Sequence, residues 1–186
     1  MKRLFDLSLA LIAILVLIIP LLIIAIAVKY TSPGPALYWS NRVGRNNILF
    51  RMPKFRSMSI ETPVLATHLL TNPEVYLTPL GKKLRKTSLD EVPQLWSIIK
   101  GDMSFVGPRP ALFNQEDLIA LRTKYGVHTL LPGLTGWAQI NGRDELHISD
   151  KVALDIKYMR KQTFWFDLKI LSLTAFKIVK GSDISH

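Results

Sequence analysis

Two adjacent acidic residues, Asp90 and Glu91, lie in the stretch TSLDEVPQLWSIIKGDMSFVGPRP (87–110), with cations close by in the sequence. Arg85 precedes the pair, and Arg109 follows it between two prolines. A carboxylate can attack phosphorus as a nucleophile, and Mg²⁺ is often held by one or two carboxylates together with phosphate oxygens. Arginine can neutralise the charge that develops during such a transfer. The residue types therefore fit phosphoryl transfer on an anionic substrate.

The same acids also have a structural interpretation. Ser88 and Glu91 have the spacing of a capping box, in which Ser88 would begin a helix and the acids would complement its positive end. A short helix is predicted over 94–100 and should end at Gly101, although Pro93 is unusual at this position. On spacing alone, capping is favoured over catalysis.

Charge and composition narrow the class of partner. The 186-residue chain carries 24 Lys and Arg against 14 Asp and Glu, a formal net charge of +10. Such a surplus indicates an anionic partner, which could be a nucleic acid, anionic lipid headgroups or a phosphorylated small molecule. We expect no nucleic acid, because no recognisable motif supports it. The absence of cysteine excludes a disulfide-stapled domain and a Cys-based zinc site.

The N-terminal region predicts a membrane helix. Leu9–Val28 contains no charged residue, and its twenty residues would reach ~30 Å, the thickness of a bilayer core. Pro20 should kink this helix, and basic residues flank both ends, which places both ends in the cytoplasm by the positive-inside rule. A re-entrant helix satisfies both observations, but a kinked spanning helix stays open on physics alone. We expect a re-entrant membrane helix over 1–30 and a cytoplasmic or interfacial catalytic domain over 31–186.

The rest of the chain predicts a mainly α protein with a small β-hairpin, an α+β fold. Strands are expected over 36–40 and 48–52, and amphipathic helices over 111–125, from Ser149 onward, and from the aromatic triplet at 164–166 to 179. The last helix carries three lysines on one sector, which is typical of a helix lying in a membrane interface. The sequence thus predicts a small cytoplasmic globular domain with interfacial helices.

Three motifs, SLDEVPQLW (88–96), KGDMSFVGPRP (100–110) and PGLTGWAQINGR (132–143), follow one another closely. With KFRSM (54–58) and the proline-broken N-terminal helix, they resemble the monotopic polyprenyl-phosphate phosphoglycosyl transferases of bacteria. In length the chain is similar to the small, catalytic-core form of that superfamily. Its members typically have Ser-Pro at the helix break, whereas Ile19 precedes Pro20 here.

The resemblance implies transfer of a phosphosugar from a UDP-sugar to polyprenyl (undecaprenyl) phosphate with release of UMP, by a ping-pong route. This would be the first membrane step of glycoconjugate assembly, at the cytoplasmic face of the bacterial inner membrane. Asp90 would be the nucleophile and form an aspartyl-phosphosugar intermediate, Glu91 would bind Mg²⁺, and Arg85 would assist catalysis. The implied substrate- and phosphate-binding residues are Arg56, Arg109, Gln139, Asn141 and Arg143.

Alternatives remain at this point. A non-catalytic basic protein that binds anionic lipid at the membrane surface would share the charge and the N-terminal helix. The run Lys54-Phe55-Arg56 could be a solvated basic patch beside lipid headgroups or a contact to substrate phosphate, and taken alone it favours the solvated patch. We expect the donor to be an N-acetylated amino sugar, on overall similarity to the small members, and leave a homodimer open.

Overall fold

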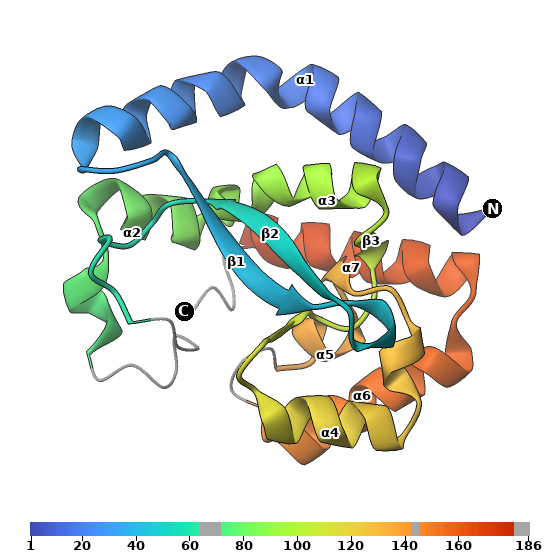
Figure 1. Cartoon of the computed structure of the whole chain (residues 1–186). Coiled ribbons are helices and arrows are strands. Elements are labelled where there is room, and N and C mark those ends of the chain that lie inside the picture. The colour runs from blue at the N-terminus through green and yellow to red at the C-terminus, as the bar shows by residue number, and fades with distance from the viewer. Residues whose placement is uncertain (64–71, 143–145, 181–186) are drawn as a thin grey trace.

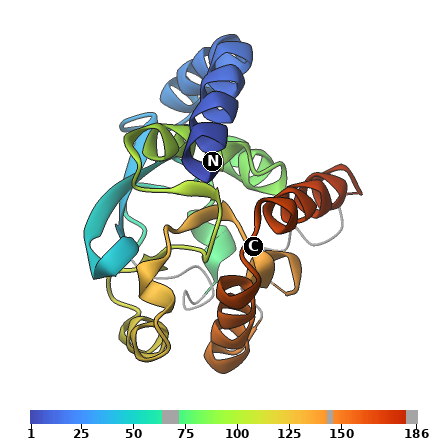
Figure 2. The same ribbon diagram turned by 90° about the vertical axis from the view of Figure 1, so that its right-hand side faces the viewer.

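A long curved helix, α1 (Lys2–Thr31), lies across the top of the protein, and the other elements gather beneath it (Figures 1 and 2). The computed structural model describes residues 1–63, 72–142 and 146–180. The strands are β1 (Leu37–Val43), β2 (Leu49–Phe55), β3 (Ser104–Val106), β4 (Ala111–Leu112) and β5 (Gly133–Thr135). The other α-helices are α2 (Pro79–Lys86), α3 (Leu95–Lys100), α4 (Glu116–Lys124), α5 (Trp137–Ile140), α6 (Ile148–Lys161) and α7 (Phe164–Lys180). Short 3-10 helices are η1 (Arg45–Asn47), η3 (Pro73–Tyr76), η4 (Leu89–Gln94) and η5 (Val127–Thr129).

Helix α1 is apolar on its outer face and packs through a narrow inner face. Ala10 belongs to the main hydrophobic core, and Val28 to a second cluster with Phe55 and Leu84. Pro20 lies between these two contacts within one continuous helix. A helix that wraps around a core curves with its convex side outward, as α1 does in Figure 1. The predicted apolar helix is confirmed, and it is the described helix long and apolar enough to cross a membrane.

The predicted hairpin is confirmed, with longer strands than expected. β1 and β2 pair antiparallel from Leu37 opposite Phe55 to Val43 opposite Leu49. The sequence did not reveal that β4 joins the free edge of β1, giving the sheet order β2-β1-β4. Because Ala111 and Leu112 form this strand, the helix expected over 111–125 begins only at Glu116. That expected helix start was wrong.

A second, two-stranded sheet pairs β3 and β5 in parallel. Each strand has three residues, too few to show a period in the sequence. Its glycines allow the backbones to meet: a Cβ atom on Gly133 would lie 2.1 Å from the amide nitrogen of Gly107. This sheet brings the 100–110 and 132–143 motifs together.

Of the two C-terminal helices, α7 packs against β3 and β5, and α6 packs against α4 and α5. The helix expected from Ser149 onward is α6, which begins one residue earlier, at Ile148, with His147 at its N-cap. In α7, Phe166 packs on Trp137 and Tyr158, whereas Trp165 is exposed. The protein is thus mostly helical with small sheets, as the α+β prediction stated.

Candidate functional site

The two acids, Asp90 and Glu91, lie in η4, directly before α3. Ser88 has a left-handed backbone with φ 55° and makes no side-chain cap bond, so the predicted capping box was wrong. The ring of Pro93 would collide with the carbonyl four residues earlier in an α-helix, and this segment is wound as a 3-10 helix instead. Both acids are buried, with 4% and 7% of their surface exposed. Two adjacent buried acids need cations or ligands close by.

A single oxygen of Glu91 accepts bonds from two cations. The Lys54 ammonium lies 2.7 Å from Oε1, and the Arg109 guanidinium lies 2.9 Å from the same atom. Burial alone would raise the pKa of Glu91, but the charges and hydrogen bonds of Arg109 and Lys54 outweigh it and hold this pKa well below its usual value. Glu91 is therefore a fixed anion at neutral pH.

Asp90 has a different environment. Its Oδ1 atom is buried and has no hydrogen-bond partner among the described residues. Burial raises the pKa of Asp90, the attraction of Lys54 opposes this, and the negative charge of Glu91 adds to it. The adjacent acids thus differ: Glu91 is held by cations, and Asp90 presents an oxygen that can meet a ligand.

Backbone bonds to three different elements fix the Pro108-Arg109-Pro110 loop. The Pro108 carbonyl accepts a bond from the Gly133 amide at the start of β5 (2.9 Å). The Arg109 carbonyl accepts one from Arg122 on α4 (2.7 Å), and the Pro110 carbonyl accepts one from Arg42 on β1 (3.2 Å). With φ of both prolines restricted, the loop holds the Arg109 side chain over Glu91.

Arg122 is itself held by a buried acid. Its guanidinium donates two hydrogen bonds, of 3.0 and 2.7 Å, to Oδ2 of Asp155 on α6. The acid thus pairs across to α4, and the charge of Lys151 on its own helix also acts on it. Asp155 therefore acts on the site through Arg122 and the backbone of Arg109.

Two of the predicted arginines, Arg85 and Arg56, have different partners. Arg85 approaches the site from α2, where it donates to the Ser57 hydroxyl at 3.0 Å, and the charges of Asp90 and Glu91 act on it. Arg56 is buried, and its guanidinium binds the carbonyls of Ser32 (2.8 Å) and Pro33 at the end of α1. The structure thus brings Arg85 to the acids and directs Arg56 to the end of α1.

The other predicted binding residues come from the 132–143 motif. Gln139 lines a cavity beside Glu91 and Arg109, and its Oε1 atom is buried without a hydrogen-bond partner among the described residues. Asn141 is exposed and donates to the carbonyl of Trp137 at 2.7 Å, within its own turn. The prediction for Arg143 lies outside the described residues.

Lys54 is the site residue that the sequence did not single out. It is the next-to-last residue of β2, and burial lowers the pKa of its ammonium although Glu91 opposes this. The run Lys54-Phe55-Arg56 was interpreted as a solvated patch or a phosphate contact. Nothing local shows that β2 packs against η4, and so places Lys54 beside Glu91.

The donor atoms present suit a hard cation held together with phosphate. Asp90 and Glu91 supply carboxylates, and Mg²⁺ usually takes one or two carboxylates plus phosphate oxygens. The unpartnered Oδ1 of Asp90 is an oxygen that such an ion could contact. No group of three or more His, Cys, Asp and Glu side chains that could hold a metal ion occurs among the described residues.

The chain matches the family model described as "Bacterial sugar transferase" over residues 1–181. It is 41% identical over 185 residues to the UDP-glucose:undecaprenyl-phosphate glucose-1-phosphate transferase of Escherichia coli K12, covering 95% of this chain and 40% of that protein. It is 36% identical over 198 residues to the undecaprenyl-phosphate galactose phosphotransferase of Salmonella typhimurium, covering 98% and 41%. An uncharacterized sugar transferase of Bacillus subtilis, EpsL, is 38% identical over 188 residues, covering 100% and 91%. The chain thus spans about two fifths of the first two relatives and most of the third.

The electrostatics of the pair can be measured directly. We expect the carboxyl of Asp90 to titrate above the ordinary aspartate range, because burial disfavours its charged form. Lys54→Met should raise this pKa further, since the lysine attracts the ionised form. Carbon-13 NMR of labelled aspartate, assigned with Asp90→Asn, measures both. Lys161→Met, at an exposed lysine on α6, is the control; an Asp90 pKa at or below the ordinary range would contradict the site geometry.

Proposed function

Because this chain belongs to the bacterial sugar transferase family, we propose that it transfers a sugar 1-phosphate from a UDP-sugar to polyprenyl phosphate and releases UMP. The observation that carries this proposal is the buried pair Asp90 and Glu91, with Lys54 and Arg109 on one carboxylate oxygen. The names of the relatives, which specify glucose or galactose and undecaprenyl phosphate, support the same reaction.

Asp90 is the proposed nucleophile. Its carboxylate oxygen attacks the β-phosphorus of the donor, the bond from that phosphorus to the bridging oxygen breaks, and UMP leaves with that oxygen. A phosphate oxygen of the acceptor then attacks the aspartyl-phosphosugar, and the bond to Asp90 breaks, which regenerates the carboxylate. The products are UMP and polyprenyl-diphospho-sugar. The support is that Asp90 has a buried oxygen free of hydrogen bonds among the described residues.

The cations bind and neutralise the phosphates in this proposal. With Lys54, Arg85 and Arg109 positive and Asp90 and Glu91 negative, the five groups sum to a formal +1, which suits an anionic ligand. Arg109 can offer further donors to phosphate while one nitrogen binds Glu91. Because the loop fixes its backbone, little reorganisation is needed when charge develops.

Glu91 would hold Mg²⁺, which leaves the Asp90 carboxylate to act as the nucleophile. When bound, the ion would supply positive charge to the donor diphosphate and favour departure of UMP. In the described structure Lys54 and Arg109 already stabilise the charge of Glu91. These cations therefore keep the carboxylate ionised and ready to bind a metal ion.

The function is tested by UMP release from purified protein in vesicles with undecaprenyl phosphate, Mg²⁺ and a panel of UDP-sugars. The panel includes glucose and galactose, from the relatives' names, and the N-acetylated amino sugars that we expect from the sequence. We predict release with at least one donor. Asp90→Asn should lower it by about 10⁴-fold or more, the usual scale for losing a nucleophile, and chelation of Mg²⁺ should abolish it.

Asp102→Asn is the matched control, because Asp102 pairs with Lys100 near the surface, away from the acid pair. It should keep near wild-type turnover. No UMP release with any donor, while an active relative works in the same vesicles, would contradict the enzyme proposal and favour a non-catalytic protein that binds anionic lipid. An active Asp90→Asn variant would contradict the covalent route.

We further propose that α1 is re-entrant and that the protein is monotopic, on the cytoplasmic face of the bacterial inner membrane. The support is that both ends of α1 bind the same globular body. At the N-terminal end, Lys2 pairs with Asp167 of α7, and Arg3 binds the last carbonyls of α3. At the other end, Arg56 binds the carbonyls of Ser32 and Pro33. The two ends of a spanning helix would lie on opposite sides of the bilayer, where a globular body on one side could not contact both.

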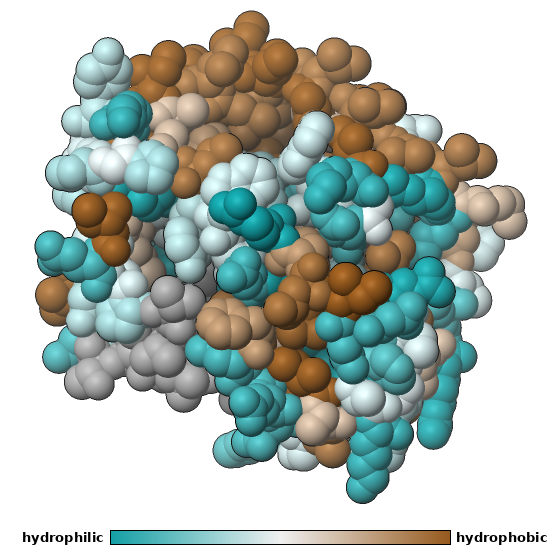
Figure 3. All heavy atoms as spheres, in the orientation of Figure 1, coloured by the Kyte–Doolittle hydropathy of each residue, from teal (hydrophilic) through white to brown (hydrophobic). Residues whose placement is uncertain are grey.

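The distribution of apolar residues on the surface supports a shallow insertion of α1 into the bilayer. Apolar side chains cover the outer side of α1 as a continuous band in Figure 3, and hydrophilic residues prevail below it. On α7, exposed Trp165 and Phe176 could reach the headgroup region. Of the three lysines predicted to form an interfacial stripe, Lys169 and Lys180 are exposed, and Lys177 lines the cavity.

The topology can be mapped with single cysteines because the chain has none of its own. Leu4→Cys and Tyr30→Cys, at exposed positions near the two ends of α1, should react with an impermeant maleimide only from the cytoplasmic side. Ile19→Cys, in the exposed middle of the helix, should be protected in the bilayer and react in detergent. Labelling of Leu4→Cys from the periplasmic side would show that α1 spans the membrane.

A further inference from the structure

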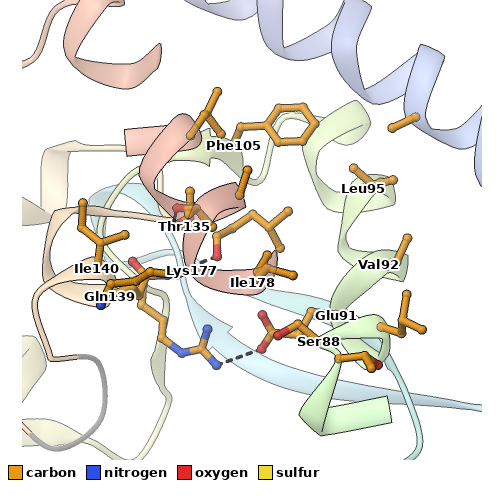
Figure 4. A pocket seen from close by; sticks show the side chains of 18 of the residues that line it. Ser88, Glu91, Val92, Leu95, Phe105, Thr135, Gln139, Ile140, Lys177 and Ile178 are labelled. Atoms are coloured by element: carbon orange, nitrogen blue, oxygen red, sulfur yellow. Dashed lines mark hydrogen bonds and ion pairs between the residues drawn. The ribbon is translucent and has the colours of Figure 1, made fainter. Parts of the chain in front are cut away.

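A cavity of about 420 Å³ lies between α1, η4, β5 and α7. Figure 4 shows Glu91 and Ser88 at one end of it and Phe105 at the other. Its volume is within the range of small-molecule sites. The cavity thus begins at the acid site and extends toward the membrane helix.

Most of the lining is apolar. Leu95, Phe105, Leu134 and Leu171 contribute to it, and Ile178 comes from the last turns of α7. Two hydroxyls in the wall, those of Thr135 and Thr174, bond to each other at 2.8 Å and so need no ligand. An uncharged hydrocarbon is therefore the suitable occupant of this part of the cavity.

The end near the acids is charged. Arg109 and Glu91 both line it, and their ion pair is drawn in Figure 4. Lys177 of α7 lines the cavity too. A ligand that combines a hydrocarbon with an anionic head matches both parts, whereas the polar groups of a nucleotide would leave hydrogen bonds unmade in the apolar part.

The wall opposite α7 belongs to the membrane helix. Ala13 and Leu17 of α1 line the cavity, and their neighbours Leu15 and Val16 are exposed on the outer, apolar side of the same helix. One helix therefore contacts the cavity on one face and offers the other to the bilayer. A chain from the bilayer could enter along α1 without exposing its hydrocarbon to water.

We propose that this cavity binds the proximal isoprene units of the acceptor polyprenyl phosphate and directs its phosphate to Arg109 and Lys177 beside the acid pair. This inference rests on the proposed function, and it adds the binding site of the acceptor. The donor would approach the acids from outside the cavity. Filling the cavity should then weaken the binding of the acceptor and leave the binding of the donor unchanged.

Two substitutions on opposite walls test this. Ala175→Phe on α7 and Ala13→Phe on α1 each place a ring in the cavity. We expect the KM for undecaprenyl phosphate to rise by about tenfold or more, because each excluded methylene loses several-fold in affinity, while the KM for the UDP-sugar stays within about twofold. Ala153→Phe, at an exposed alanine on α6, is the matched control and should change neither constant. An unchanged acceptor KM in Ala175→Phe would overturn the proposal.

A second measurement does not depend on turnover or on folded variants. Wild-type protein in vesicles is irradiated with a polyprenyl phosphate that carries a diazirine in its first isoprene units, and the labelled peptides are sequenced. We expect label on the segments of α1 and α7 around Ala13 and Ala175. Undecaprenyl phosphate should compete with this labelling, whereas phosphatidylglycerol should not. Label confined to other surfaces, or displaced equally by phosphatidylglycerol, would refute the acceptor site. If the proposed reaction fails with every UDP-sugar, this labelling still decides whether the cavity binds a polyprenyl phosphate.

Discussion

The arrangement of this protein depends on one carboxylate oxygen, Oε1 of Glu91, which binds Lys54 at 2.7 Å and Arg109 at 2.9 Å. Burying these charges is costly unless each is paired in good geometry. The hairpin supplies Lys54, η4 supplies Glu91, and the loop before β4 supplies Arg109. Because the three partners come from separate parts of the chain, the ion pairs can form only when those parts are folded together.

The bonds around Arg109 show how this fold stiffens a loop without regular structure. The Arg109 carbonyl accepts a hydrogen bond from α4. The carbonyls of the flanking Pro108 and Pro110 accept hydrogen bonds from β5 and β1, respectively. Asp155 extends this support to α6 through Arg122. A charged group held in this way loses little freedom when a phosphate arrives, which is how supporting residues far from a reaction contribute to it. The same sheet contacts shape the cavity under α1, so the charged site and its apolar extension share one framework.

The sequence predicted those elements whose formation depends on residues that are neighbours in the chain. The charge-free run of α1, the hairpin and the end of α3 at Gly101 were visible because each follows from neighbouring residues. The motifs also identified Asp90, Glu91 and Arg109, which the structure brings together. Lys54 was not recognised, and Arg56 proved to bind the end of α1, because these contacts join residues more than twenty positions apart. The capping box failed since Pro93 and the left-handed Ser88 favour a 3-10 turn.

In the proposed reaction Asp90 becomes covalently attached to the phosphosugar, while Glu91 stays an ionised partner of Lys54 and Arg109. This step is tested most directly by mass spectrometry of the purified protein, mixed with its UDP-sugar and Mg²⁺ in the absence of acceptor and digested after acid quench. We expect a phosphosugar adduct on Asp90 that disappears when polyprenyl phosphate is added. An adduct on another residue, or UMP release that occurs only with acceptor and leaves no adduct, would contradict it.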